Sequence, residues 1–291
     1  MSTPYITPAM LLQADTGIDW STIVPGHTND SVTDAEQANI CWRATETADL
    51  FCNQVLRATL DAETVDAPGE RAVLLPNGTA RLFLSRWPVI YLASVQVAIS
   101  DFPPTWNSLP PGSYRVRNLS TDTVSGAGAY SIDIAPGYVS WMGGRYGYQI
   151  QVEYINGWPH ASTTASALAG ATSLVIDDVT GFLAGQEFTI YDGANTERLV
   201  VASASSQSGP GTVTLVGPTA YAHAAGVLAT ALPAAIQQAC IYIATYIALT
   251  RGATAVAIPP VRGLTESGQG KPDRWLMDEA ERRLQPYRRV V

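Results

Sequence analysis

Charged side chains are scarce in this sequence: Asp, Glu, Lys and Arg make up 14% of its 291 residues, against about 25% in an average soluble domain. Much of the surface must therefore be neutral or covered by neighbouring molecules. The sequence also lacks the run of about 20 apolar residues that an α-helix needs to cross a bilayer. Its hydrophobic content of 46% excludes a disordered chain, and its first residues lack the basic and apolar segments of a secretory signal. We expect a soluble protein that folds in a cytoplasm.

Cysteine is nearly absent as well, with three residues in all. Cys41 and Cys52 lie on one expected helix, about 16 Å apart at 1.5 Å per residue, which excludes a disulfide between them. Cys240 lies in a second apolar helix. We expect buried thiols that pack as small hydrophobic groups.

Motifs for metal binding and for catalysis are also missing. His27, His160 and His223 are far apart, and none lies in an HExxH or CxxC context. The sequence contains no GxSxG nucleophile elbow. The segment 268–272, GQGKP, resembles a fragment of a phosphate-binding loop, but it lacks the first glycine and the Ser or Thr after the lysine. We therefore expect a flexible loop there, no cofactor and no enzymatic activity.

Two groups of residues leave other interpretations open. Asp177, Asp178, Asp192 and Glu197 are candidate calcium ligands or a glycosidase pair, although solvated turn residues fit better. Several aromatic residues are candidates for stacking on sugars or bases, although aromatic side chains in antiparallel strands more often form core and interfaces. These aromatic residues are Trp87, Tyr91, Trp106, Trp141, Tyr146, Tyr148, Tyr154 and Trp158.

The N-terminal part of the chain reads as two helices followed by strands. Thr7 and Pro8 predict the start of a short helix that ends near Gly17. The spacing of Thr33 and Glu36 is that of a capping box, and it predicts a longer helix from Thr33 to about Leu60. Short β segments follow up to Trp158, including a hairpin around the turn Asn77–Gly78.

The composition changes near Pro159 to a linker-like run of small residues, 161–173. Four β segments follow, and then come an apolar helix from Pro233 to about Gly252 and an amphipathic helix over 273–284. We expect an α+β fold, with a helical body and a small antiparallel sheet formed by residues 1–160 and 231–291. Residues 161–230 are expected to form an inserted all-β domain that resembles a sandwich or barrel.

Three segments, in this order, carry a resemblance to a known family: Leu82–Val97, Val152–Pro159 and Leu232–Leu249. With the acidic N-terminal helices before them, they resemble the gp6-like head-tail connector (adaptor) proteins of tailed bacteriophages. The sequence departs from that family in one place. In shorter members the second segment runs almost directly into the third, whereas here residues 161–230 intervene.

The resemblance implies a structural virion protein and not an enzyme. Its implied place is the neck of the virion, at the head-tail interface, after synthesis in the host cytoplasm. There the family forms a ring, usually a dodecamer, beneath the portal protein and around the DNA channel. The implied partners are the portal protein, a stopper or tail terminator protein and further copies of this chain, with no membrane. Double-stranded DNA would pass through without sequence-specific binding.

The resemblance also implies a portal-binding segment, because the C-terminal segment of the family reaches the portal. A flexible basic tail with aromatic residues can order on a partner and supply anchors and charge. Deletion of residues 272–291 is then expected to leave a folded protein that no longer joins portal-bearing heads. The residues implied are Trp275, Leu276, Arg282, Arg283, Tyr287, Arg288 and Arg289.

Residues 1–70 are strongly acidic, with eleven acidic residues against Arg43 and Arg57. We expect Asp34, Glu36 and Asp49 to face the channel, where like charge keeps DNA from sticking as it slides. Two alternatives stay open: a phage stopper or tail-completion protein, and a carbohydrate-binding virion module built on the β insert.

Overall fold

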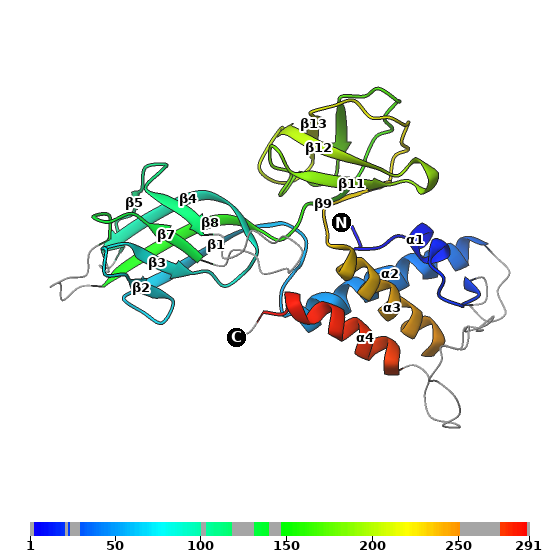
Figure 1. Ribbon diagram of the computed structural model, residues 1–291, viewed down its shortest axis with the longest axis horizontal. Helices are drawn as coiled ribbons and strands as arrows, with labels where there is room; N and C mark the ends of the chain where they lie inside the picture. Colours follow the sequence, from blue (N-terminus) through cyan, green and yellow to red (C-terminus); the bar gives the residue numbers. More distant parts are fainter. Residues whose placement is uncertain are drawn as a thin grey trace. The chain divides into compact units, whose positions relative to one another are not determined.

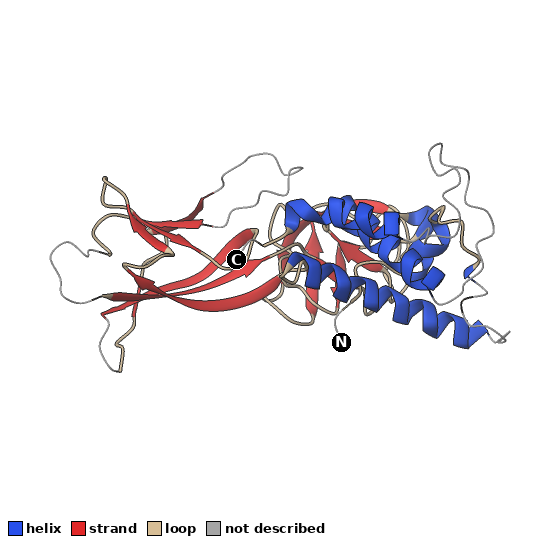
Figure 2. Ribbon diagram, turned by 90° about the horizontal axis from the view of Figure 1, so that it is seen from below, coloured by secondary structure: helices blue, strands red, loops and turns tan. Residues whose placement is uncertain are grey.

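The chain forms two compact units in its computed structural model. Figure 1 labels the helices and strands that they contain. One unit comprises Met1–Val55 and Leu232–Val291, and the other comprises Leu56–Ala231. Strands are the commoner element, with fourteen in the described residues, all in antiparallel sheets (Figure 2). The structure describes residues 3–20, 23, 30–99, 103–117, 131–139, 147–250 and 274–289.

The first unit is helical. It contains α1 (Pro8–Gln13), α2 (Asp30–Cys52), α3 (Ala234–Thr250) and α4 (Arg274–Leu284), and a 3-10 turn, η3 (Gln285–Tyr287), follows α4. Helix α3 packs against both α2 and α4, so the cover that its apolar sequence requires comes from the same chain. The described helices include none that is long and apolar enough to span a membrane.

All three cysteines are free and buried in this helical unit, as expected. Burial raises the pKa of Cys41 and of Cys52 to about 12. It also raises the pKa of Cys240. The three thiols therefore stay protonated and pack as small apolar groups.

The ends of the N-terminal helices follow local signals only in part. The start of helix α1 is confirmed, because the Thr7 hydroxyl accepts a hydrogen bond from the N–H of Met10 at 3.3 Å. Its expected end near Gly17 is wrong, since the helix ends at Gln13. The expected limits of α2 are wrong, since it begins at Asp30 and ends at Cys52. Asn53 follows it in the left-handed conformation, with φ of 53°. The left-handed residue closes the helix, as asparagine often does.

The expected fold class, a helical body with a small sheet, is wrong. Eight strands precede the insert and form two four-stranded sheets. The first has the order β1-β8-β4-β5 and the second the order β2-β3-β7-β6. Their bounds are β1 Thr59–Ala67, β2 Ala72–Leu74, β3 Ala80–Phe83, β4 Val89–Ile99, β5 Asn107–Ser108, β6 Tyr114–Arg117, β7 Ser131–Ile134 and β8 Tyr148–Asn156.

Strand β1 explains most of this error. Its sequence, TLDAETVDA, holds three acidic residues and has low intrinsic β propensity. Its extended state depends on pairing with β8 along its whole length, from Thr59↔Asn156 to Ala67↔Tyr148. One hydrophobic core contains residues of both sheets, including Val95 and Ile132, so the sheets pack face to face as a sandwich.

Residues 160–230 form a third sheet, with the order β10-β13-β12-β11-β14-β9. The four β segments expected from the sequence are confirmed as β10 to β13. Hydrogen bonds from Thr164 N–H to the Val175 carbonyl, at 2.8 Å, and from Asp177 N–H to the Ser162 carbonyl, at 2.9 Å, join its two outer regions. The sheet is therefore curled like a small barrel. Its strands are β9 His160–Ser162, β10 Ser173–Ile176, β11 Glu187–Tyr191, β12 Glu197–Ala204, β13 Gly211–Leu215 and β14 Leu228–Thr230.

The expected linker over residues 161–173 is wrong. Ala161 and Thr163 are buried, and Ala167 pairs with His223. Residues 164–166 and 168–170 of this segment are exposed and form turns, so its small residues are held by backbone pairing at its ends and at Ala167 and not by burial. Independent folding of residues 161–230 stays a prediction, since the compact unit that contains them also contains the sandwich.

A glycine fixes the turn that follows β8. Gly157 has φ of +86°, and a Cβ atom at this position would lie 2.5 Å from the carbonyl oxygen of Arg57. Its N–H donates to the carbonyl of Pro88 at 2.9 Å. The neighbouring Trp158 N–H donates to the carbonyl of Leu56 at 3.1 Å. The turn thus joins the end of β8 to the segment that leads into β1 and to the start of β4.

We expect Gly157→Ala to destabilise the sandwich by at least about 2 kcal/mol, because strain and a backbone clash act together. Amide hydrogen exchange of β1 and β8 measures this change in the sandwich itself. Gly137→Ala is the matched control, since Gly137 has φ of +92° and a Cβ atom added there would meet nothing within 4 Å. Equal effects of the two substitutions would show that the clash with Arg57 is unimportant.

Candidate functional site

The C-terminal segment, residues 274–289, forms α4 and η3 and is not a flexible tail. Leu276 and Tyr287, both expected to bind the portal, are 5% and 4% exposed. They lie in the core of the helical unit with Ala280 and Leu284, which are also buried. Neither Leu276 nor Tyr287 is therefore on a surface that a partner reaches.

The arginines of α4 are paired within the helix. Arg282 Nε lies 2.8 Å from Glu279 Oε2, and Arg283 Nε lies 2.8 Å from Glu279 Oε1. The hydrogen bond from Arg282 is the main cause of the lowered pKa of Glu279. Arg283 also lies over the ring of Tyr242, with 5.5 Å from its Cζ to the ring centroid, and Trp275 contacts the same ring at 6.2 Å between centroids.

The last described residues are tied to the end of α2. The N–H of Arg289 donates to the carbonyl of Cys52 at 2.8 Å. The Gln54 amide donates to the carbonyl of Tyr287 at 3.0 Å. Arg288 lies over the ring of Phe51 at 5.5 Å. The expected portal-binding residues thus lie in α4, in η3 and in the two residues that follow η3, and Trp275, Arg282 and Arg288 are exposed.

The three acidic residues expected to face DNA lie on α2 in different surroundings. Asp34 is exposed. Glu36 is half-buried and accepts a hydrogen bond from the Asn39 amide at 3.1 Å. Asp49 accepts a hydrogen bond from the hydroxyl of the buried Tyr5 at 2.6 Å. A role in the channel stays a prediction, and the contact with Tyr5 gives Asp49 a second role inside the unit.

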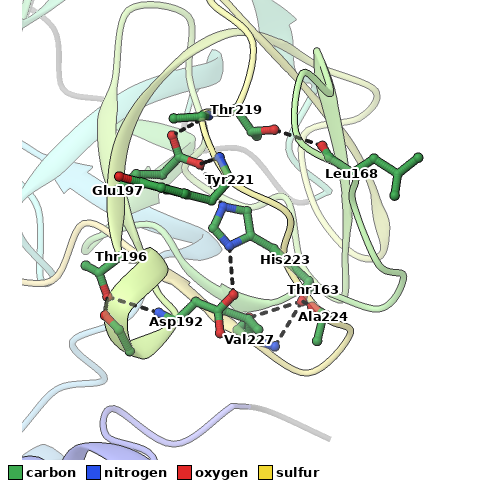
Figure 3. A network of polar contacts seen from close by, with 12 residues as sticks. Thr163, Leu168, Asp192, Thr196, Glu197, Thr219, Tyr221, His223, Ala224 and Val227 are labelled. Carbon is green, nitrogen blue, oxygen red and sulfur yellow. Dashed lines mark hydrogen bonds and ion pairs between the residues drawn. The ribbon is translucent and has the colours of Figure 1, made fainter.

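A buried histidine between two carboxylates is the most concentrated polar site in the barrel-like sheet (Figure 3). Asp192 follows β11 and Glu197 opens β12, so the tight turn between these strands puts both carboxylates at the same end of the hairpin. His223 Nδ1 lies 2.9 Å from Asp192 Oδ2, and His223 Nε2 lies 2.7 Å from Glu197 Oε1. The side chain of His223 is 0% exposed.

The backbone around His223 is held by the same groups. His223 and Ala167 exchange two backbone hydrogen bonds of 2.8 Å. Glu197 accepts bonds from the N–H of Ala220 at 2.9 Å and of Tyr221 at 3.3 Å. Burial alone would raise the pKa of Glu197, but these backbone bonds and the contact with His223 outweigh it, so the pKa is lowered.

This arrangement is structural in character. Both nitrogens of the ring already face carboxylate oxygens, and the ring is closed off from solvent, so it has no free atom for a substrate or a metal ion. No group of three or more potential ligands in the described part of the chain is arranged to hold a metal ion.

The four acidic residues singled out in the sequence are thus divided. Asp192 and Glu197 meet at His223, whereas Asp177 and Asp178 hold turns. Asp177 accepts from the N–H of Ser162 at 2.7 Å. Asp178 accepts from the N–H groups of Thr180 and Gly209, at 2.9 and 3.1 Å. Neither a calcium site nor a glycosidase pair results from these contacts.

The sequence interpretation missed the role of His223, because its carboxylate partners lie 31 and 26 positions away. The one local signal is that Asp192 and Glu197 stand on either side of a turn between two β segments.

The aromatic residues serve mainly for packing. Tyr154 is buried, and its hydroxyl donates to Glu63 at 3.0 Å. Trp87, Trp106, Tyr148 and Trp158 are half-buried. Of the aromatic residues proposed for stacking, Tyr91 is 38% exposed, and Trp141 and Tyr146 lie outside the described residues. In the barrel-like sheet, the rings of Phe182 and Phe188 pack edge to face in the core, at 5.2 Å between centroids.

The chain matches no model of a known protein family, no curated protein and no solved structure at a significant level. The resemblance of the three segments to connector proteins therefore stays a prediction. What the chain does has to be inferred from its own residues and geometry.

The burial of α4 leads to a stability prediction. Leu284→Ala should destabilise the helical unit by about 2–5 kcal/mol, because Leu284 is 1% exposed and its loss leaves a cavity. All three thiols are buried in this unit, so their reaction with Ellman's reagent in rising urea reports on its unfolding. Leu50→Ala is the control, since Leu50 is 81% exposed. Unchanged thiol protection in Leu284→Ala would contradict this role of α4.

By the same reasoning, deletion of residues 272–291 should unfold the helical unit instead of leaving it intact.

The lowered pKa of Glu197 leads to a prediction on acid stability. A carboxylate with a lowered pKa in the folded state contributes stability above its ordinary pKa, and this contribution is lost as the pH falls through the folded value. On acidification the amides of Ala220 and Tyr221 should lose protection from hydrogen exchange. Glu197→Gln should show weaker protection near pH 7 and a smaller loss on acidification. Glu187→Gln is the control, because Glu187 is exposed and pairs only loosely with Arg198, at 3.7 Å. The same acid dependence in Glu197→Gln as in the unsubstituted protein would refute the assignment.

Proposed function

We propose that the chain is a structural subunit of the neck of a tailed bacteriophage, a head-tail connector (adaptor). In this role several copies form a ring beneath the portal, join the DNA-filled head to the tail and surround the passage for DNA. The proposal rests on the three segments that resemble connector proteins. It includes the portal protein, a stopper or tail terminator and copies of the chain as partners.

The placement of these segments is the observation that supports the proposal best. The first segment, in β4, pairs with the second, in β8, with Leu92 opposite Tyr154 and Val95 opposite Val152. The second segment ends in the turn at Gly157. The third segment contains α3, the helix that packs against both α2 and α4. The resemblance therefore lies in residues that determine the cores of both units. This is expected if the chain shares its framework with the connector proteins and differs from them on its surfaces.

The use of polar groups also favours a structural role. His223 has both ring nitrogens bound to carboxylates, and the pKa values of the cysteines keep their thiols protonated. In the sandwich, Glu63 accepts hydrogen bonds from Arg71 at 2.7 Å and from Ser85. In each case a side chain of a type that enzymes use in catalysis is instead buried or bonded within the fold.

The exposed residues of the C-terminal segment define the surface that we assign to the portal. Trp275 is 36% exposed, the side chain of Arg282 is 74% exposed, and Arg288 is exposed. Tryptophan and arginine are the residue types that most often dominate binding energy at protein interfaces. Leu276 and Tyr287 hold this surface in place from the core side.

We expect a variant with Trp275→Ala, Arg282→Ala and Arg288→Ala to bind portal-bearing heads at least about tenfold more weakly than the unsubstituted protein. Co-sedimentation of the full-length protein with heads that carry portals but no tails measures this binding. Thiol protection in urea checks that the helical unit remains folded. The control is Arg43→Ala with Glu46→Ala, two exposed residues of α2.

The outcomes test the connector function and the assigned portal-binding surface separately. If the unsubstituted protein does not co-sediment with portal-bearing heads, the connector proposal is wrong. If it binds and the triple variant binds equally well, the function is retained and the assigned surface is wrong.

A further inference from the structure

The two contacts of the His223 ring with carboxylates depend on how many protons the ring carries. A neutral imidazole carries one N–H group, so only one of its nitrogens can donate a hydrogen bond. Here both nitrogens face carboxylate oxygens, at 2.9 Å and 2.7 Å. In the neutral ring one of these contacts would bring a lone pair against a carboxylate. With both carboxyl groups ionised, both contacts are hydrogen bonds only when the ring carries two protons.

The surroundings of the ring supply no other charge that could replace the second proton. The segments packed around it, 163–172 and 217–227, contain no Asp, Glu, Lys or Arg, and Tyr221 is their one titratable residue besides His223. The charged groups that face the ring in the described structure are Asp192 and Glu197. Arg198 instead lies 3.7 Å from Glu187 on an exposed face. The protonated ring is therefore the cation that balances the two half-buried carboxylates.

The ring is one of several groups that hold one segment of the chain. Residues 217–227 have little regular structure, and they are anchored to residues 163–171 by backbone bonds and to Glu197 through Ala220 and Tyr221. The ring adds contacts to both carboxylates of the β11–β12 hairpin. Tyr221, which is 45% exposed, lies in this segment. Loss of one contact of the ring leaves a half-buried carboxylate facing a lone pair, which favours release of the segment.

We propose that His223 is a protonation-dependent latch. While the ring carries two protons, residues 217–227 are locked on the β11–β12 hairpin, and when the ring loses one proton the segment is released. The segment then opens without unfolding of the sheet, because its strands are paired independently of the ring. This device does not depend on the connector proposal.

Two NMR observables on the full-length protein labelled with ¹⁵N test the latch over about pH 5 to about pH 10, a range that spans the usual titration of histidine. The ring nitrogen shifts show whether His223 carries one proton or two. Hydrogen exchange of the amides of Ala220, Tyr221 and His223, corrected for the intrinsic effect of pH, shows whether the segment is closed. We expect the two to change together, with exchange about 10- to 100-fold faster once the ring is neutral.

Asp192→Asn separates the latch from a simple ion pair. The new amide can donate to Nδ1 of a neutral ring, while Nε2–H still donates to Glu197, so the segment should stay protected after the ring has lost its second proton. Glu187→Gln removes the same charge from the exposed face of the hairpin and should leave the pH dependence unchanged.

Four results would each overturn the proposal. The first is protection that stays constant while the ring titrates. The second is a neutral ring in the protected segment of the unsubstituted protein. The third is a ring that keeps both protons up to about pH 10, because the segment would then never be released. The fourth is an unchanged pH dependence in Asp192→Asn.

Discussion

Strand β8 is the constraint on which the sandwich depends. It pairs on one side with β1 from Thr59↔Asn156 to Ala67↔Tyr148, and on the other side with β4 from Val89↔Asn156 to Ile99↔Tyr148. These pairings join residues that are far apart in the chain, so the entropy of closing long loops has to be offset by burial of Ile150, Val152 and Tyr154 in the common core. The turn at Gly157 follows directly from this arrangement, because the chain must leave β8 against the backbone of Arg57 and Pro88.

Local signals in the sequence predict the helices well and their ends less well. Thr7 and Pro8 suffice for the start of α1, because a cap acts over one turn. The end of α2 could not be predicted, because the apolar periodicity of the sequence continues through Val55 and Leu56. In the structure the helix ends before Asn53, which adopts a left-handed conformation. The strand β1 was missed for the opposite reason: its acidic sequence is weak as a strand, and pairing with β8 decides its state. Non-local pairing likewise ties residues 161–173 to the third sheet, at both ends and at Ala167, although their composition is that of a linker.

Sequence patterns at the C-terminus predicted the correct element and a partly wrong role. The amphipathic pattern of α4 is what a helix needs to pack on its own core, and Leu276, Leu284 and Tyr287 serve that purpose. A pattern of apolar residues beside arginines does not distinguish an intramolecular contact from a partner's surface, because both bury the same residue types. The close spacing of Glu279, Arg282 and Arg283 was the available sign that the arginines pair within the helix.

The scarcity of charge has a structural counterpart, because many of the charges that are present are paired inside the fold. Arg81 and Arg115 both approach Asp133, whose side chain is 8% exposed. Glu63 accepts bonds from Arg71, Ser85 and Tyr154. Burial alone would raise its pKa, but the bonds from Arg71 and Ser85 lower it. Polar groups that are buried and fully bonded fix one arrangement of the chain, since any alternative would leave them unsatisfied. If the chain acts as a connector, specificity for its partners then has to come from shape and from a few exposed anchors such as Trp275.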